Sequence, residues 1–158
     1  MTPAIRALEA AVVPFVLHPY ERGDTGHDTG HDFGREAADA LGLDHDRVFK
    51  TLVVVCDGTE AVAVVPVSCR LALKAMGAAL GAKRVEMCEV ERAERITGFV
   101  AGGISPFGQK RRLATVVDET CGLHETIYVS GGRRGLDVEV APADLIAVTG
   151  ALVADIAV

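Results

Sequence analysis

The sequence predicts a single domain of mixed α/β class, in which helices surround one curled β-sheet. Two observations carry this prediction. Strand-like apolar runs occur in pairs around turn signals, as at 48–56 and 60–65 on either side of Asp57-Gly58. Other strand-like runs follow segments with a helical spacing of apolar residues, most of which end at a glycine. Strands that arrive both in hairpins and after helices indicate a sheet with mixed strand directions.

The first half of the chain alternates helices with strands. Thr2 is a good N-cap and Pro3 suits a first helical turn, so 3–12 is expected to be a helix. Alternation from Phe15 predicts a short strand that stops near Pro19. The elements that follow end at glycines or turn residues: a loop at 21–32, a helix at 34–41, strands at 48–56 and 60–65, and helices at 71–80 and 89–96.

The second half begins with a glycine-rich loop, and hairpins dominate after it. Strands are expected at 114–117 and 126–129, with a glycine turn at 130–135 and a returning strand at 136–140. Pro142 opens a last helix that extends to about Val148, and 152–156 is expected to be a final strand.

Composition bounds the class of protein. The 158 residues are 49% hydrophobic but only 4% aromatic, without Trp, so the core is expected to be aliphatic. A formal net charge of −6 argues against a nonspecific nucleic-acid coat but allows a local basic patch. No signal segment or membrane-spanning run of ~18 apolar residues is recognisable, and the four cysteines form no CxxC pair. We therefore expect a cytoplasmic protein with reduced thiols, no membrane association and no zinc knuckle.

A direct repeat stands out in the first long loop. TGHD occurs at 25–28 and again at 29–32. Its His and Asp residues could bind a metal ion if the segment were helical, but the glycine in each copy argues against a helix. We interpret the repeat as a short duplicated insertion and expect no metal site.

The stretch GGISPFGQKRR at 102–112 is a candidate ligand loop. Its glycines and proline exclude a helix interior or a central strand, and glycine lets the backbone approach a ligand closely. Ser105 and Gln109 offer hydrogen bonds, and three cations follow at 110–112. A backbone cradle beside cations suits a phosphate-bearing ligand. The alternative is a tight loop with a solvated basic tail.

Lys50 and Asp137 are the most unusual single residues. Lys50 lies inside an apolar strand, on the face of Leu52, Val54 and Cys56, so it either extends to solvent at the strand end or points into a polar cavity. On 136–140, Asp137 faces away from the apolar side of its strand. It lies either on a solvated hairpin face or against a substrate amino group, which a carboxylate suits.

No protein nucleophile is evident. The chain has neither a GxSxG elbow nor an HExxH motif, and its five histidines are scattered. Each cysteine is better explained by packing than by catalysis. If the protein is an enzyme, much of the chemistry is expected to belong to the substrate.

With these stretches in view, the chain resembles the YbaK family of Cys-tRNA(Pro)/Cys-tRNA(Cys) deacylases. The resemblance runs nearly end to end and rests on five segments, with the TGHD duplication as the main departure. They are MTPAIRALE, FKTLVV around Lys50, LGAKRVEM at 80–87, TGFVAGGISPFGQKRR at 97–112 and TIYVSGGRRGLDVEVAPADL at 126–145.

The resemblance implies the fold of the editing domain of prolyl-tRNA synthetases, no cofactor, and removal of misattached cysteine from tRNA. In this family the substrate's own thiol is thought to attack the ester and leave as a thiolactone. Aminoacyl-tRNA is then the substrate, and prolyl-tRNA synthetase is a candidate partner.

The resemblance also implies site residues. Lys50 would place the phosphate or ribose of the 3′-terminal adenosine, and the backbone N–H groups near Gly102, Gly103 and Ile104 would steady the oxyanion. The other roles fall into three groups: Tyr20, Phe33 and Thr51 as pocket walls; Ser130 and Asp137 around the amino group; and Lys83, Arg84, Lys110, Arg111, Arg112, Arg133 and Arg134 as contacts to acceptor-stem phosphates.

Three other functions stay open. A sister specificity would clear alanine from tRNA(Pro), although the longer matching segments favour cysteine. A binding module without catalysis would hold aminoacyl-tRNA or dock on the synthetase. A metal-dependent hydrolase that uses the TGHD repeat ranks last, because no other ligand cluster is visible.

Overall fold

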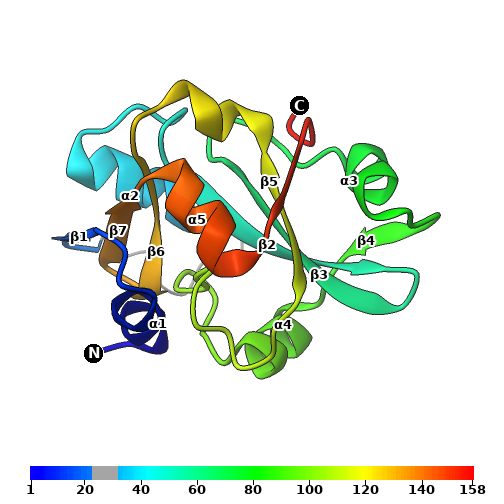
Figure 1. Ribbon diagram of the computed structural model, residues 1–158, viewed down its shortest axis with the longest axis horizontal. Helices are drawn as coiled ribbons and strands as arrows, with labels where there is room; N and C mark the ends of the chain where they lie inside the picture. Colours follow the sequence, from blue (N-terminus) through cyan, green and yellow to red (C-terminus); the bar gives the residue numbers. More distant parts are fainter. Residues whose placement is uncertain (23–31) are drawn as a thin grey trace.

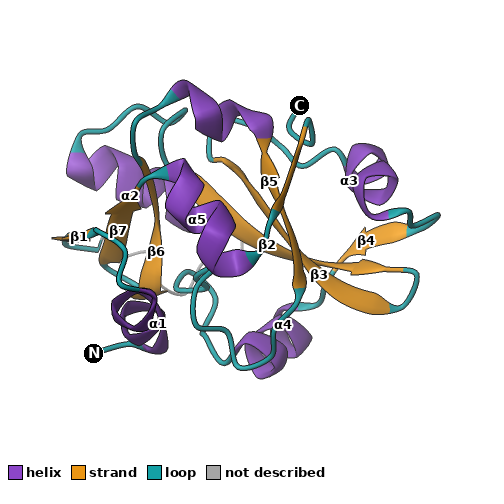
Figure 2. Ribbon diagram, in the orientation of Figure 1, coloured by secondary structure: helices purple, strands orange, loops and turns teal. Residues whose placement is uncertain are grey.

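The computed structural model describes residues 1–22 and 32–158, which contain five α-helices, one 3₁₀-helix and eight strands (Figures 1 and 2). The helices are α1 (Pro3–Ala11), α2 (Phe33–Leu41), α3 (Leu73–Leu80), α4 (Val90–Thr97), α5 (Pro142–Thr149) and the 3₁₀-helix η1 (Glu119–Leu123). The strands are β1 (Val16–Pro19), β2 (Phe49–Cys56), β3 (Thr59–Pro66), β4 (Val85–Met87), β5 (Ala114–Asp118), β6 (Ile127–Arg133), β7 (Leu136–Val140) and β8 (Leu152–Ala154).

The predicted mixed α/β class is confirmed, but the strands form two sheets rather than one curled sheet. The larger sheet has the order β4-β2-β3-β5-β8, with antiparallel pairs around β2 and parallel pairs around β5. The smaller sheet, β1-β7-β6, is antiparallel. The sheets meet at a single parallel bridge between Val48 and Tyr128. Hairpin signals identify strands that pair locally but carry no information on which hairpins share a sheet.

The helix and strand segments predicted from periodicity are all present within a few residues of the expected bounds. Two elements were missed. Strand β4 is only three residues long, and η1 is held by the Asp118 carboxylate, which accepts a hydrogen bond from the Thr120 N–H at 3.2 Å. Segments this short leave no readable periodicity.

The expected glycine turn at 130–135 is wrong in its extent. Strand β6 continues through Gly131 and Gly132 to Arg133, and the chain reverses only around Arg134 and Gly135. The glycines form a β-bulge, because the pairing with β7 shifts register between Ser130 and Arg133. A bulge re-aims the strand next to it, and this one lies beside the candidate site.

Three apolar clusters hold the elements in place. The largest joins the two sheets to α1 and α5 through residues such as Leu8, Val64, Val129 and Leu145. A second packs α3 on the outer face of the larger sheet, and a third packs α2 against Val48 and the outer face of the smaller sheet. Helix α2 and α1 therefore lie on opposite faces of the smaller sheet (Figure 1). No helix in the described part of the chain is long and apolar enough to cross a membrane.

A polar network on the outer face of the smaller sheet ties the entrance of β2 to β6 and β7. The Arg47 guanidinium donates to the carbonyl and hydroxyl of Thr126 at 3.0 and 2.5 Å. The Thr126 hydroxyl in turn donates to Glu139 at 2.5 Å, and His18 Nε2 lies 2.9 Å from the same carboxylate. The hydrogen bond from Thr126 and, to a smaller extent, the contact with His18 hold the pKa of Glu139 below its ordinary value.

We predict that Glu139→Gln destabilises the protein in a pH-dependent way. A lowered folded-state pKa stabilises the fold above ~4.3, the ordinary value for glutamate, and this stabilisation is lost as the pH falls through the folded-state value. At pH 7 the variant should lose about 1–2 kcal/mol, or roughly 3–6 °C in Tm. Thermal unfolding followed by circular dichroism at pH 7 and pH 3.5 measures this, with the exposed Glu125→Gln as control. A loss equally large at pH 3.5 would contradict the assignment.

Candidate active site

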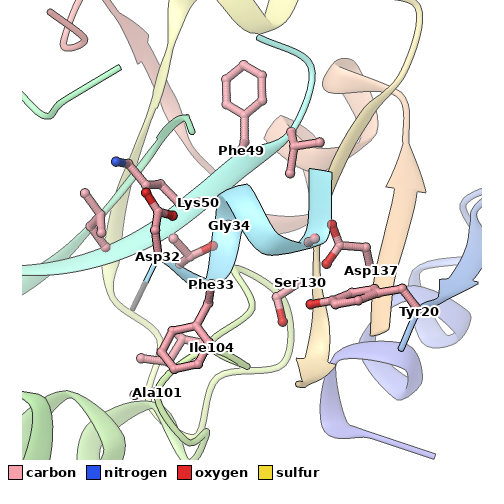
Figure 3. Close-up of a pocket in the computed structure, with 15 residues that line it drawn as sticks. Tyr20, Asp32, Phe33, Gly34, Phe49, Lys50, Ala101, Ile104, Ser130 and Asp137 are labelled. Atoms are coloured by element: carbon pink, nitrogen blue, oxygen red, sulfur yellow. The ribbon is translucent and has the colours of Figure 1, made fainter. Parts of the chain in front are cut away.

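The candidate site is a cavity of about 370 Å³ that opens between α2, the first half of β2, the glycine loop and the end of the smaller sheet (Figure 3). Eight of the nine residues that sequence analysis assigned to catalysis or substrate binding line it: Tyr20, Phe33, Lys50, Thr51, Gly102, Ile104, Ser130 and Asp137. They come from six separate stretches of the chain. The fold thus assembles one pocket from residues up to 117 positions apart, counted from Tyr20 to Asp137.

Asp137 occupies the end of the pocket formed by the smaller sheet. It is directly opposite Ser130 in the β6–β7 pairing, so both side chains point to the same face. Asp137 is 4% exposed, and its Oδ2 has no hydrogen-bond partner within the described residues. Burial raises the pKa of this carboxyl to about 7. The solvated hairpin face considered above is therefore excluded for Asp137, which lies ready to accept a buried polar partner.

Tyr20 lies beside Asp137 at this end of the pocket (Figure 3). Its backbone N–H donates to the Gly135 carbonyl at 2.9 Å, which continues the β1–β7 pairing by one residue. Burial, together with the nearby Asp137 carboxylate, raises the pKa of the Tyr20 hydroxyl to about 12. The hydroxyl thus stays protonated at neutral pH and keeps both its donor and its acceptor capacity.

Lys50 lies at the other end of the pocket, well separated from Asp137 (Figure 3). As predicted, it shares a face of β2 with Val54 and Cys56, which belong to the core under α3. Lys50 itself is only partly buried and has no ion pair with any residue in 1–22 or 32–158. Lys50 thus lines the cavity while it stays partly exposed near the start of its strand. The pocket therefore has a cation at one end and a buried carboxyl at the other.

The pocket reaches both faces of β2 because the edge of this strand is open there. Strand β4 pairs only with residues 54–56, and the bridge to β6 is at Val48. The Val53 carbonyl accepts from Cys88 on the β4 side, so by the alternation of an antiparallel ladder Thr51 directs its backbone groups to the same side. The Thr51 hydroxyl is also buried and without a partner in the described structure. Thr51 thus offers the pocket several unused polar groups, although its side chain alternates with that of Lys50.

The glycine loop forms the wall opposite β2. Gly102 has φ +84°, and a Cβ at this position would lie 2.7–2.9 Å from the Phe33 ring. Arg134 clamps the same place, since its guanidinium lies 4.7 Å from the centre of the Phe33 ring and donates to the Ala101 carbonyl at 2.6 Å. Gly102 is therefore required both for its backbone conformation and for the space that Phe33 occupies.

Three residues of the glycine loop do not serve a ligand in the expected way. The Gly103 N–H donates to the Val100 carbonyl at 2.8 Å, and Gly103 does not line the pocket. Gly103 instead lets the loop approach the backbone of Arg133, which a Cβ would meet at 2.8 Å. Ser105 is fully buried and accepts from the Phe107 N–H, and Gln109 donates to the Ser105 carbonyl. These side chains fold the loop onto itself because its own backbone groups need partners.

Other lining residues were missed from the sequence. Asp32, the last residue of the TGHD repeat, lies at the pocket and caps α2 by accepting from the Arg35 N–H at 3.0 Å. An aspartate just before a helical segment is the signal that could have identified it. The rest of the repeat lies outside the described residues, and within them no group of three or more His, Cys, Asp or Glu could hold a metal ion.

The seven cations predicted to meet RNA do not form one patch. Arg133 and Arg134 lie on the β6–β7 turn near the pocket, and Lys83 and Arg84 precede β4, where their backbone N–H groups bind the Asp57 carboxylate. Arg112 lines a small hollow near α5. Lys110 and Arg111 face a separate groove beside α4. The structure therefore separates these residues into several local groups.

Comparison with known proteins identifies relatives along nearly the whole chain. Residues 27–148 match the family model described as an aminoacyl-tRNA editing domain. The chain is 35% identical over 156 residues to an Enterococcus faecalis protein named "Putative Cys-tRNA(Pro)/Cys-tRNA(Cys) deacylase EbsC", with coverage of 98% of this chain and 92% of the relative. It is also 36% identical over 115 residues to a "Proline--tRNA ligase" of Shouchella clausii, covering 66% of this chain but only 20% of the ligase.

Solved structures share the fold over their full length. Hypothetical protein APE2540 is 25% identical, with a TM-score of 0.86 and coverage of 99% of both chains. A crystal structure described as "a putative trans-editing enzyme for prolyl tRNA synthetase" is 26% identical, with a TM-score of 0.80 and coverage of 100% of this chain and 99% of the other. The arrangement of two sheets and surrounding helices is thus that of these proteins.

We predict that Asp137→Asn stabilises the protein as the pH rises. The folded state holds a proton on Asp137 up to about pH 7, whereas the unfolded chain releases it near 3.8, so wild-type stability falls across this interval. Asparagine removes that cost, which is at most ~4 kcal/mol. The Tm difference between variant and wild type should grow from pH 4 to pH 7 and then level off. Calorimetry with the exposed Asp155→Asn as control measures it, and a difference independent of pH would refute the buried carboxyl.

We also predict that Gly102→Ala is more damaging than Gly42→Ala. Both glycines have positive φ, so both substitutions cost about 1 kcal/mol in the backbone. Only at position 102 must an aromatic ring move, which adds about 1–3 kcal/mol. Chemical denaturation of the two variants isolates this second cost. Equal losses of stability would show that Phe33 can move from Gly102 without penalty.

Proposed function

Because this chain belongs to the aminoacyl-tRNA editing domain family, as the resemblance to YbaK proteins predicted, we propose that it is an aminoacyl-tRNA deacylase acting in trans. Its substrate is tRNA(Pro) that carries cysteine in error, together with Cys-tRNA(Cys). The observation that carries this proposal is the layout of the pocket, with an unpartnered buried carboxyl at one end and Lys50 at the other.

The two ends of the pocket suit the two ends of an aminoacylated nucleotide. A free α-amino group is cationic or near titration at neutral pH. It pairs with the Asp137 carboxylate, whose ionised form then becomes the favoured one, since a nearby positive charge offsets the cost of burial. Ser130 and Tyr20 lie beside it as further hydrogen-bonding groups. Lys50, at the far end, holds the phosphate or ribose of the terminal adenosine.

The cleavage step uses the substrate's own nucleophile. The cysteine sulfur attacks the carbonyl carbon of the ester and gives up its proton, and the carbon–oxygen bond to the ribose breaks. The ribose oxygen leaves with a proton, so the products are a cyclic cysteine thiolactone and tRNA with a free 3′ end. This route agrees with the sequence, which has no recognisable nucleophile elbow, and with the cysteine side chains, each of which is buried or half-buried.

Charge that develops on the carbonyl oxygen requires hydrogen-bond donors. Gly102 and Ile104 line the pocket, and their backbone N–H groups have no acceptor within the described residues. We assign the oxyanion contacts to these two groups, while the engaged N–H of Gly103 is left out. Donors held in place by the clamped loop cost no reorganisation during the reaction.

A separate editing step is needed because the wrong and the right amino acid are similar in size. Cysteine and proline are similar in volume, and a synthetase pocket discriminates a methylene-scale difference by only ~1–3 kcal/mol. The sister reaction, removal of alanine from tRNA(Pro), needs no thiol. The nature of the aminoacyl group in the experiment below therefore separates the two specificities.

We predict that wild-type protein clears radiolabelled cysteine from Cys-tRNA(Pro) but spares Ser-tRNA(Pro), in which oxygen replaces sulfur. Lys50→Ala should lower the rate at least about 100-fold, because the ester loses its positioning group. Lys50→Arg keeps the charge but changes the shape, and full activity in this variant would argue against a positional role.

The control for this experiment is Lys74→Ala, which removes an exposed lysine of α3 outside the pocket and should leave the rate unchanged. Equal clearance of serine would exclude attack by the substrate thiol. A preference for Ala-tRNA(Pro) would move the protein to the sister specificity. Binding of tRNA without clearance of any amino acid would indicate a binding module.

A further inference from the structure

A further hollow, of about 460 Å³, lies beside α4 and differs from the pocket in its lining. It is lined by Glu60, Arg92, Arg95, Ile96, Lys110 and Arg111, and we call it the α4 groove. Four of its six lining residues are cations and one is an anion, which leaves an excess of three positive charges. Such an excess is notable on a chain whose formal net charge is −6.

The single carboxylate of the groove is already engaged. Both Nε and Nη2 of Arg92 lie 2.9 Å from Glu60 Oε1, and the Glu60 side chain is only 15% exposed. A hydrogen bond from its own backbone N–H and, to a smaller extent, the hydrogen bond from Arg92 hold the pKa of the Glu60 carboxyl below its ordinary value. Arg95, Lys110 and Arg111 are exposed and have no ion pair with any other described residue. The groove thus presents three cations without an ion pair among the described residues, beside Arg92, which is bound to Glu60.

The same loop connects the groove to the pocket. The Lys110 N–H donates to the Thr97 carbonyl at 2.8 Å, which closes residues 98–109 into a loop at its base. The Ala101 N–H donates to Glu94 of α4 at 2.7 Å, which fixes the loop to the helix. The groove lies at the base of this loop, whereas Gly102 and Ile104 near its tip face the pocket.

The β2–β3 pairing gives the separation of the two sites. Glu60 is opposite Val55, and Lys50 is opposite Val65, so the two positions are five residues apart along the strands, with their side chains on opposite faces of the sheet. At about 3.4 Å a residue this is ~17 Å along the sheet. A stacked nucleic-acid strand carries one phosphate per ~3.4 Å, so it crosses this distance in about five nucleotides.

We propose that the α4 groove binds backbone phosphates of the RNA whose aminoacylated 3′ end occupies the pocket. This inference rests on the proposed function and adds Arg92 and Arg95 to the expected contacts Lys110 and Arg111. A guanidinium group can bind two oxygens of one phosphate at once. The arginines of the groove line a hollow at about the distance from the pocket that a few nucleotides of bound RNA would span. An acidic protein surface is the competing partner.

The test measures binding of uncharged tRNA(Pro) to the full chain across a range of salt concentrations. We expect Arg95→Ala and Arg111→Ala each to raise Kd about five-fold at low salt and to reduce the slope of log Kd against log salt by about 0.7–0.9 for each phosphate that the variant no longer binds. Glu60→Gln should act in the opposite direction, with tighter binding, because it removes the only anion among the described residues that line the groove. Arg70→Ala, an exposed cation outside the groove, is the matched control.

Wild-type affinity and salt slope in both arginine variants would overturn the proposal and leave an acidic protein as the candidate occupant. Equal weakening by Arg70→Ala would also overturn it, because the effect would then come from overall charge. The assay uses uncharged tRNA, so its result does not depend on deacylation. A protein that binds RNA through the groove but clears no amino acid would contradict the proposed function and not this inference.

Discussion

Strand β2 is paired along its whole length with β3, but on its other side only its ends are covered, by the bridge to β6 at Val48 and by β4 at residues 54–56. The pocket occupies the gap between these two contacts. Backbone polar groups cannot stay buried without partners, so a gap in a ladder must face solvent or a ligand. The two sheets, α2 and the glycine loop surround this gap, and every residue of the pocket is placed by its relation to it.

The buried carboxyl of Asp137 shows what such a site costs. Its register opposite Ser130 and the cover provided by Tyr20 and α2 remove it from water without supplying a hydrogen bond to Oδ2. The fold tolerates this because a large aliphatic cluster forms on the opposite face of the same sheet. In the proposed function, this cost in stability is offset when the cationic amino group of the substrate pairs with the carboxylate.

The cationic side chains of this acidic chain fall into two groups, those with structural contacts and those without. Arg134 is used structurally, since it stacks on Phe33 and holds the Ala101 carbonyl, and Arg47 joins the two sheets. Arg95, Lys110 and Arg111 have no such internal role among the described residues. The distinction between engaged and uncommitted cations, rather than the net charge, identifies the surface where an anionic partner would bind.

The sequence by itself determined the local elements, the mixed α/β class, the family and most of the pocket residues, because periodicity, turn chemistry and the matching segments are all local signals. It also identified Lys50 and Asp137 as charged residues that are unusual in their largely apolar strands. Only the tertiary structure decided that there are two sheets, that Gly103 and Ser105 serve the loop itself, and that Arg92 and Arg95 join Lys110 in one groove. These features depend on contacts between segments far apart in the chain, which a linear pattern does not encode.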